Sequence, residues 1–400
     1  MYAGTLIAGF HIGRGESQFG PSAVAQASFE KALVHNWGEG DNAVETITVA
    51  LDPYYPNGPL ISKRVSLGRG TRTVNLPVVR EVLLSLSSSY ELLRWAIRND
   101  SGSVLLAFHY PPVSAPILGL CRVLNIPAIV ILTDLPLFSY SSARVRKMPI
   151  WKRFIMLGYR SFAEWLIKRY DGYVLFSRHM SKLVNPRAKP EAVVEGIFNP
   201  ASLALAPNRP TRRKGVIAHA GTLNREYGIE NLLDAFSLVR DPEAQLWLFG
   251  AGDMDYEIEQ RSINDSRIKH FGFRPRDEVF AKLAEATLLV VTRDPSAEFT
   301  KYSFPSKLFE YLATGTPVAC TELAGIPAEY FEYILRLEYA SSESMAAQLG
   351  CVLGMDADDL DNRGRSGQRF VLEAKGPDVQ VGRIKMFVHS VARRFYKVEG

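Results

Sequence analysis

Short apolar strands alternate with amphipathic helices along this 400-residue chain, and the pattern occurs in both halves. In the first half it predicts strands at 5–10, 45–51, 103–108, 128–132 and 173–176, and helices at 23–37 and 82–98. In the second half it predicts strands at 215–220, 245–249, 267–271, 288–292 and 317–320, and helices at 229–239, 277–285 and 306–314. Because strands that alternate with helices form parallel sheets covered on both faces, the sequence predicts an α/β protein with two doubly wound domains.

The domain boundary is expected near 199–211, a stretch that contains proline and is partly basic. We therefore expect one domain at 1–200 and a second at 201–375. The segment 376–400 is expected to form a last helix that crosses back to the first domain. Because open α/β sheets bind ligands beyond the carboxyl ends of their strands, the loops after the strands are the expected places for functional residues.

Composition excludes several classes of protein. Apolar residues make up 47% of the chain and charged residues 22%, which excludes a mostly disordered chain. Cys121, Cys320 and Cys351 lie far apart, so we expect no disulfide framework and no structural zinc site, as is typical of a reducing compartment. The start of the chain lacks a signal-peptide pattern, and no run of 18 apolar residues predicts a membrane span.

Positive charge is concentrated in one segment. Residues 144–182 hold ten Lys or Arg and two acidic residues, a net charge of +8, whereas the whole chain carries +5. Charge this concentrated indicates an anionic partner, either membrane phosphate or nucleic acid.

The same basic segment contains an amphipathic helix. Its apolar residues recur at helical spacing on one face: Trp151, Phe154, Ile155, Phe162, Trp165 and Leu166. Its cations lie around the other side: Lys152, Arg153, Arg160 and Lys168. Such a helix can lie on a membrane, with aromatic rings toward acyl chains and cations toward lipid phosphates. The ordinary alternative is a helix that packs its apolar face on the core.

Two short motifs resemble known ligand sites but fit them poorly. Gly13 and Gly15 follow the first predicted strand, but Gln18 stands where a dinucleotide fingerprint needs its third glycine. The ordinary interpretation is a loop whose glycines let another ligand or a domain approach the backbone. Asp253 and Asp255 could hold a divalent metal, but Asp253 is more simply a helix N-cap, so no metal site is predicted.

The region 293–318 carries the strongest signal for a binding site. Ser306 can cap a helix whose first N–H groups face a strand end and would attract a diphosphate. Lys307 adds a positive charge, and Glu310 can accept hydrogen bonds from two sugar hydroxyls one turn later. An ordinary capped helix with surface charges explains the same pattern equally well.

Four motifs in order along 215–333 resemble the nucleotide-sugar domain of GT-B glycosyltransferases, specifically family 4 of the retaining enzymes. They are Gly-Thr-Leu-Asn-Arg-Glu-Tyr-Gly at 221–228, Leu-Phe-Gly-Ala-Gly-Asp at 248–253, Phe-Gly-Phe-Arg at 271–274 and Phe-Pro-Ser-Lys-Leu-Phe-Glu-Tyr-Leu-Ala-Thr-Gly-Thr-Pro-Val at 304–318. The stretch 298–307 is similar to a branch found among bacterial capsule, exopolysaccharide and cell-wall transferases. The resemblance implies a GT-B fold, in which two Rossmann-like domains face each other across a cleft.

The resemblance also assigns donor-binding residues. Glu310 matches the glutamate that typically holds the nucleotide ribose. The first glutamate of the family's E-x7-E pair is replaced by Tyr302, so Tyr302 or Glu298 is expected to take its place. Pro305 stands where the family has a glycine amide, which leaves the Ser306 and Lys307 amides.

Cations for the diphosphate are also expected from the resemblance. The family's phosphate-binding Arg and Lys correspond to Thr222 and Tyr227, so Arg225 is the expected substitute, with Arg293 and Lys307. They are needed because the leaving diphosphate gains charge in the transition state. The full set of expected donor-binding residues is Thr222, Asn224, Arg225, Arg274, Arg293, Glu298, Tyr302, Ser306, Lys307 and Glu310.

Two polar residues follow predicted strands in the first half. His109, in a predicted loop at 109–112, resembles the family's strand-end histidine, which faces the acceptor and the donor sugar. Asp134 follows the next strand and is expected near the same cleft. The ordinary alternatives are a turn histidine bonded to the backbone for His109 and an N-cap or turn residue for Asp134. The expected catalytic residues are His109, Asp134, Arg225 and Lys307. The resemblance also implies that the loop with Gly13 and Gly15 lies on the acceptor side.

The resemblance implies a metal-independent hexosyltransferase that moves a sugar, with retention, from a nucleoside-diphosphate sugar to a lipid-linked or glycan acceptor in surface-polysaccharide or cell-wall biosynthesis. No cofactor is expected. With the basic segment, it predicts a cytoplasmic enzyme on the anionic inner face of the membrane. A nucleotide-sugar epimerase or a phosphorylase-like GT-B enzyme is the alternative. A basic nucleic-acid-binding protein is a remote alternative, because the sequence has no recognition-helix or RNP-type motif and Glu310 would have no role in such a protein.

Overall fold

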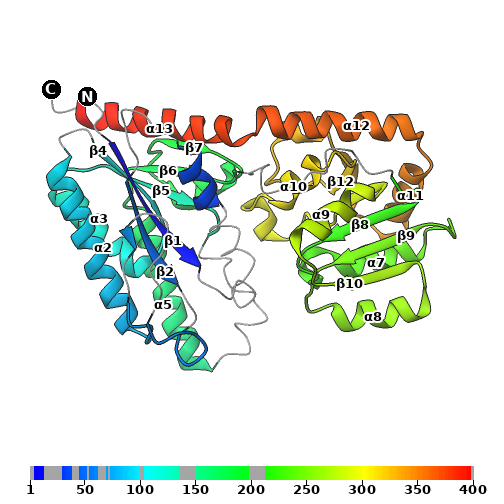
Figure 1. Cartoon of the computed structure of the whole chain (residues 1–400), viewed down its shortest axis with the longest axis horizontal. Coiled ribbons are helices and arrows are strands. Elements are labelled where there is room, and N and C mark those ends of the chain that lie inside the picture. The colour runs from blue at the N-terminus through cyan, green and yellow to red at the C-terminus, as the bar shows by residue number, and fades with distance from the viewer. Residues whose placement is uncertain are drawn as a thin grey trace. The chain divides into compact units, whose positions relative to one another are not determined.

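The computed structural model of the chain describes residues 4–12, 29–37, 45–51, 54–61, 69–70, 73–99, 103–135, 149–197 and 212–397. The chain divides into two compact units (Figure 1). Unit 1 consists of Met1–Ile197 and Pro377–Gly400, and unit 2 of Phe198–Gly376. Each unit holds one parallel sheet, so the predicted fold class, two doubly wound α/β domains, is confirmed.

Unit 1 is built on a seven-stranded sheet in the order β3-β2-β1-β4-β5-β6-β7. The strands are β1 Gly4–Ile12, β2 Glu45–Leu51, β3 Arg69–Gly70, β4 Ser103–Phe108, β5 Ala128–Leu132, β6 Gly172–Leu175 and β7 Glu191–Val193. The helices include a segment at 29–35, α2 Val79–Arg98, α3 Pro111–Val123, α5 Ile150–Ile167, η2 Arg178–Met180, α6 Ser181–Val184 and α13 Pro377–Lys397. Every residue of β4, β5 and β6 is buried, which is why these strands are apolar without alternation.

Unit 2 repeats the scheme on a six-stranded sheet in the order β10-β9-β8-β11-β12-β13. The strands are β8 Val216–Ala220, β9 Gln245–Phe249, β10 Ile268–Gly272, β11 Leu288–Val291, β12 Val318–Thr321 and β13 Leu335–Leu337. The helices are η4 Arg225–Tyr227, α7 Ile229–Ser237, α8 Asp255–Asn264, α9 Arg276–Glu285, η5 Glu298–Lys301, α10 Lys307–Ala313, η6 Ala328–Glu332, α11 Ser342–Leu353, α12 Ala357–Arg369 and η7 Phe370–Ala374.

The sheet of unit 2 has a hydrophobic core on each face. Alternate residues of β9 enter different cores, Trp247 and Phe249 on one face and Leu246 and Leu248 on the other. This double burial explains why β9 is a continuous apolar run. Strand order reverses between β8 and β11, and the crevice at such a reversal is where open α/β sheets bind ligands. The loops that follow these two strands are therefore the first places to search for a site.

One predicted loop is wrong. We expected a loop through 109–112, but α3 begins at Pro111. A proline at the first helical position removes an N–H that would have no partner in the helix, so two prolines can open a helix as readily as a turn.

The last helix, α13, belongs to unit 1, where it contacts β4 and β7. Val381, Ile384 and Val388 of this helix are buried. Near its start, the Gln380 amide donates a 2.9 Å hydrogen bond to Oε2 of Glu195, and both side chains are buried. Unit 1 is therefore assembled from two segments of chain that flank the whole of unit 2.

Candidate functional site

The α-carbon of Gly221 lies against the side chain of Lys307, directly after β8. A β-carbon built at Gly221 would lie 2.0 Å from Nζ of Lys307 and 2.2 Å from its Cε, and the backbone has a φ of +126°. Any larger residue would therefore displace the lysine. The first residue of α10 thus extends its amine to the carboxyl end of β8.

A buried histidine holds the other side of this amine. His219, on β8, is 2% exposed, and its Nε2 lies 3.5 Å from Nζ of Lys307. Its Nδ1 lies 2.9 Å from the Val290 carbonyl oxygen on β11. Burial, and next the positive charge of Lys307, lower the pKa of His219 to about 3, so the imidazole is neutral. Sequence reasoning missed this residue; the available signal was one histidine in an apolar strand, two residues before a strand-end glycine.

A second cation lies near Lys307. Burial and then the charge of Arg293, which follows β11, lower the pKa of Lys307 to about 7, while Glu310 opposes the shift. The Arg293 guanidinium lies 4.8 Å from the centre of the Tyr227 ring, which in turn contacts Phe299 edge-on. These contacts join the loops that follow β8 and β11, as predicted for a strand-end site. The Arg293 guanidinium thus lies beside Tyr227, the residue at the position where the resemblance leads us to expect a phosphate-binding lysine.

Glu310 is already hydrogen-bonded to a cation. Nη2 of Arg276, on α9, lies 2.7 Å from Oε1 of Glu310, and 35% of the Glu310 side chain is exposed. Burial raises the pKa of the Glu310 carboxyl, and the charges of Arg276 and Lys307 oppose this rise. Arg276 was not predicted, and its sequence context gives no signal for it.

The start of α10 differs from the expectation. Ser306 occupies the N-cap position, but its side chain makes no capping hydrogen bond, so the predicted cap is wrong. Its backbone is already helical, with a φ of −53° and a ψ of −27°, whereas a capping side chain needs an extended backbone. The Leu308 and Phe309 amides bond to the Pro305 and Ser306 carbonyls.

The Gly221 loop is braced by the side chains of Asn224, which sequence reasoning assigned to the donor, and of Asp253. The Asp253 amide donates to Oδ1 of Asn224, and the Arg225 amide donates to Oδ1 of Asp253. The Arg225 guanidinium pairs with Glu230 and is 60% exposed. Asn224 thus has a structural partner, and the predicted phosphate role of Arg225 stays a prediction.

Asp253 is not the helix cap that we expected. The N-cap of α8 is Met254, and Asp255 lies in the first turn, where its Oδ1 accepts from the Gly252 amide. Both carboxylates are thus bonded to backbone amides, which explains the D-x-D spacing as a loop brace. Among the described residues, no three His, Cys, Asp or Glu side chains are grouped as a metal site would require.

The remaining residues that were predicted to bind the donor differ in exposure and in the loop that carries them. Arg274 donates to the Phe271 carbonyl at the end of β10 and is exposed. Glu298 is exposed at the start of η5, while Thr222 and Tyr302 are partly buried. Their predicted contacts with the donor stay predictions.

In unit 1, His109 directly follows β4 and faces the helix layer. Both ring nitrogens are buried, its ring packs edge-on to Tyr170, and it approaches the Ala163 backbone on α5. Burial lowers its pKa to about 4, so the ring is neutral. Asp134 follows β5 and is partly buried. Gly13 and Gly15 lie outside the described residues, and the predicted roles of all four stay predictions.

Helix α5 exposes most of its predicted apolar face. Trp151, Phe154, Ile155, Phe162 and Trp165 are each between 42% and 70% exposed. Leu166 is wrongly placed in this set, because it is 3% exposed and packs in the core with Ala163 and Ile167. Within the described residues, no helix is long and apolar enough to cross a membrane.

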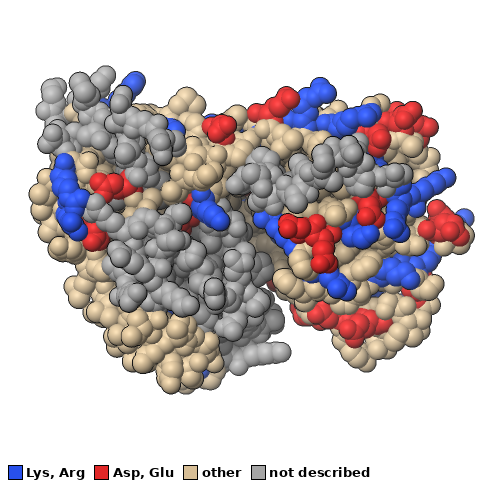
Figure 2. Space-filling model, viewed as in Figure 1, with Lys and Arg blue, Asp and Glu red and all other residues tan. Residues whose placement is uncertain are grey.

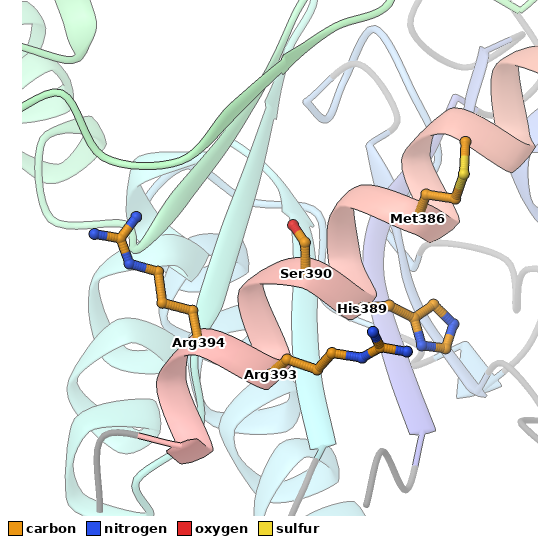
Figure 3. Close-up of a pocket in the computed structure, with 5 residues that line it drawn as sticks. All are labelled: Met386, His389, Ser390, Arg393 and Arg394. Carbon is orange, nitrogen blue, oxygen red and sulfur yellow. The ribbon is translucent and has the colours of Figure 1, made fainter.

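A separate hollow of about 720 Å³ lies along α13 (Figure 3). Met386, His389, Ser390, Arg393 and Arg394 line it. The two arginines point to different sides of the helix, and no carboxylate belongs to this set. The lining residues therefore resemble a solvated helix face more than a reaction centre, and the Gly221–Lys307 region remains the candidate site.

The comparison with known families bears on this region. Residues 214–354 match the model of the Glycosyl transferases group 1 family. The matched segment runs from just before β8 to the end of α11 and contains Gly221, Lys307 and Glu310. No curated protein matches the sequence.

Solved structures are similar to the chain over nearly its whole length. Sucrose-phosphate synthase from Thermosynechococcus elongatus has a TM-score of 0.67 at 15% identity, covering 97% of this chain and 99% of that one. Anabaena HepE in complex with UDP has a TM-score of 0.63 at 14% identity, covering 97% and 100%. A mutant of S. aureus TarM in complex with fondaparinux, alpha-GlcNAc-glycerol and UDP has a TM-score of 0.56 at 13% identity, covering 84% and 66%. These likenesses show that the fold is GT-B, as predicted.

Proposed function

We propose that this protein transfers a sugar from a nucleoside-diphosphate sugar and binds that donor beside Gly221. The observation that supports this most is the placement of two cations where the strand order reverses: the Lys307 amine lies against Gly221, directly after β8, and Arg293 follows β11. Two like charges at a strand end are stabilised by an anion, and a diphosphate supplies negative charge there. Because its charge grows as the sugar–phosphate bond breaks, the same cations favour the transition state over the bound donor.

Glu310 is proposed to accept hydrogen bonds from the ribose hydroxyls. Its pairing with Arg276 favours the ionised carboxylate against the effect of burial, and an ionised carboxylate offers only acceptors. HepE of Anabaena was solved with UDP and with UDP-glucose, which makes UDP the first nucleotide to test here.

We further propose retention of the anomeric configuration without a metal or a cofactor. The departing diphosphate oxygen would take the proton of the acceptor hydroxyl, and Lys307 and Arg293 would stabilise the diphosphate charge. Turnover should then be the same in EDTA as in manganese. Loss of turnover in EDTA, restored by manganese, would contradict this and direct attention to Asp253 and Asp255.

The acceptor is proposed to be a lipid-linked substrate or a glycan, used in surface-polysaccharide or cell-wall biosynthesis at the inner face of the membrane. The exposed aromatic residues of α5 support membrane contact, because a helix packed on a core would bury them. In Figure 2, basic and acidic side chains are interspersed over the described surface of unit 2 on the face shown. That face therefore offers no patch of positive charge alone for an anionic membrane, unlike the basic segment of unit 1.

Calorimetry with matched nucleosides and nucleoside diphosphates tests the donor site. Glu310→Gln should weaken uridine and UDP binding about tenfold, which corresponds to about 1.4 kcal/mol, because both ligands carry the ribose. Lys307→Ala and Arg293→Ala should weaken UDP binding while leaving uridine binding unchanged, and should reduce kcat further. The same comparison with GDP, ADP and dTDP identifies the base.

The matched control is Arg240→Ala, which removes an exposed arginine after α7 and should change neither affinity. If Glu310→Gln binds uridine and UDP like the wild type at an unchanged Tm, the ribose assignment is wrong. If no nucleoside diphosphate binds the wild-type protein, the proposed function is wrong as a whole.

A further inference from the structure

His219 and Lys307 are 88 residues apart in sequence but adjacent in unit 2. The imidazole is 2% exposed and lies between β11 and the start of α10. A buried polar ring in an otherwise apolar strand is costly unless both nitrogens find partners. Here one nitrogen faces a backbone carbonyl and the other faces an amine.

The partners determine where the imidazole proton lies. The Val290 carbonyl oxygen can only accept, so Nδ1 of His219 carries the hydrogen over the 2.9 Å contact. Nε2 therefore has a free lone pair, and that lone pair faces Nζ of Lys307 at 3.5 Å. The strand thus fixes a tautomer that can accept a hydrogen bond from the ammonium group.

Two other charges act on the same amine. The charge of Arg293 repels it, and the charge of Glu310 attracts it. Arg276 already binds Glu310 at 2.7 Å, which weakens that attraction. Gly221 presents no side chain, so the amine can lie against its α-carbon. The amine therefore lies between Gly221 and the acceptor that His219 presents on β8.

We propose that His219 is a positioning residue, which aims the Lys307 ammonium at the donor diphosphate without neutralising it. The inference rests on the proposed function and adds a residue to the donor site. A carboxylate in this place would form an ion pair with Lys307 and compete with the diphosphate for it. A neutral imidazole orients the ammonium without placing a negative charge beside it that would compete with the ligand.

The test compares two variants with opposite effects on the acceptor. His219→Leu removes it and should weaken UDP binding about tenfold or more, the effect of one lost hydrogen bond to a charged group. His219→Gln keeps an acceptor near the position of Nε2 and should retain most of the affinity. Uridine, which lacks the diphosphate, should bind both variants like the wild type.

A double-mutant cycle separates positioning from a structural role. In a Lys307→Met background, His219→Leu should cause no further loss of UDP affinity, because there is no amine left to position. The control is His270→Leu, which removes a partly buried histidine from β10 in the same sheet and should leave UDP affinity unchanged.

The possible failures are distinguishable. If the wild type binds none of UDP, GDP, ADP and dTDP, the proposed function fails and this inference with it. If UDP binds and His219→Leu binds it equally well, the positioning role is wrong while the donor site stands. If His219→Leu loses uridine and UDP affinity alike, or loses UDP affinity equally in the Lys307→Met background, His219 only supports the fold.

Discussion

At the residue scale, Lys307 should couple stability and ligand binding to pH in opposite directions. Its pKa falls from 10.5 to about 7 in the folded protein. Between these values the unfolded chain binds the extra proton, so the Lys307 contribution to the unfolding free energy increases as pH rises. A diphosphate prefers the protonated amine, so UDP affinity should decrease over the same interval. His219, with a pKa of about 3, stays neutral throughout, and Arg293 stays charged.

Calorimetry and thermal unfolding between about pH 6 and 9 measure both dependences across the Lys307 titration. Lys307→Met should flatten the decrease in UDP affinity and remove the corresponding part of the stability gain. Lys269→Met, which changes an exposed lysine on β10, should alter neither. An affinity that does not depend on pH in the wild type would mean that Lys307 does not bind the diphosphate.

The sequence predicts some residues of the candidate site and not others. Lys307 and Glu310 were predicted because they lie in a local motif with a fixed spacing. His219 and Arg276 were not, because each acquires its partner only when separate strands and helices come together, 88 and 34 residues apart. A histidine in a buried strand is indistinguishable, by pattern alone, from one that only fills the core.

At the element scale, α12 holds α10 in place through a close backbone approach. A β-carbon at Gly364 would lie 1.9 Å from the Gly315 carbonyl oxygen, and Gln368 donates to the Ala313 carbonyl. Gly364→Ala should therefore separate the helices and destabilise unit 2 by about 1–3 kcal/mol.

Gly350→Ala on α11 is the matched control, since a β-carbon there meets nothing within 4 Å and a helical alanine should stabilise by about 0.5–1 kcal/mol. Urea unfolding measures both, and equal effects would exclude the close approach.

Helix α5 gives the second prediction at this scale. Trp151→Ser with Phe154→Ser should release the protein from anionic vesicles, because these are 61% and 70% exposed aromatic side chains beside Lys152 and Arg153. UDP binding should be unchanged. Co-sedimentation with phosphatidylserine and with phosphatidylcholine vesicles measures the effect.

The control pair for α5 comes from α2, where Leu86 and Ile97 are 64% and 76% exposed outside the basic segment. Leu86→Ser with Ile97→Ser should bind anionic vesicles like the wild type. A wild-type protein with no preference for anionic over neutral vesicles would contradict the membrane proposal.

The bounds of a strand could be predicted where the strand coincides with a single apolar or alternating run of sequence. The predicted bounds of β2, β4, β5 and β9 match the structure, because each strand is a single apolar or alternating run with clear ends. The three-residue strands β7 and β13 are too short to show a period, and they form because their neighbours supply the hydrogen bonds. Helix α3 was missed because its prolines indicated a turn.

At the scale of the whole molecule, unit 1 should depend on α13 while unit 2 does not. Ile384 is fully buried in unit 1, whereas Met386 on the same helix is 68% exposed. Ile384→Ala should destabilise unit 1 by about 2–5 kcal/mol, and Met386→Ala should stay within about 0.5 kcal/mol. In Ile384→Ala, hydrogen–deuterium exchange measured on separate peptides should show faster exchange of the amides in β4 and β6 and unchanged exchange in β8 and β11. Equal loss in both sheets would mean that α13 does not stabilise unit 1 selectively.

The split of unit 1 around unit 2 also sets an order in time. During synthesis, the ribosome makes all of Phe198–Gly376 after the seventh strand of the first sheet and before the helix that completes its core. At about 5–20 residues per second this takes roughly 10–40 s. Throughout that delay the surface that Val381, Ile384 and Val388 will cover is exposed to water and to other chains. The nascent protein therefore exposes this apolar surface for the whole interval between β7 and α13, and it is then that a chaperone would have the most to protect.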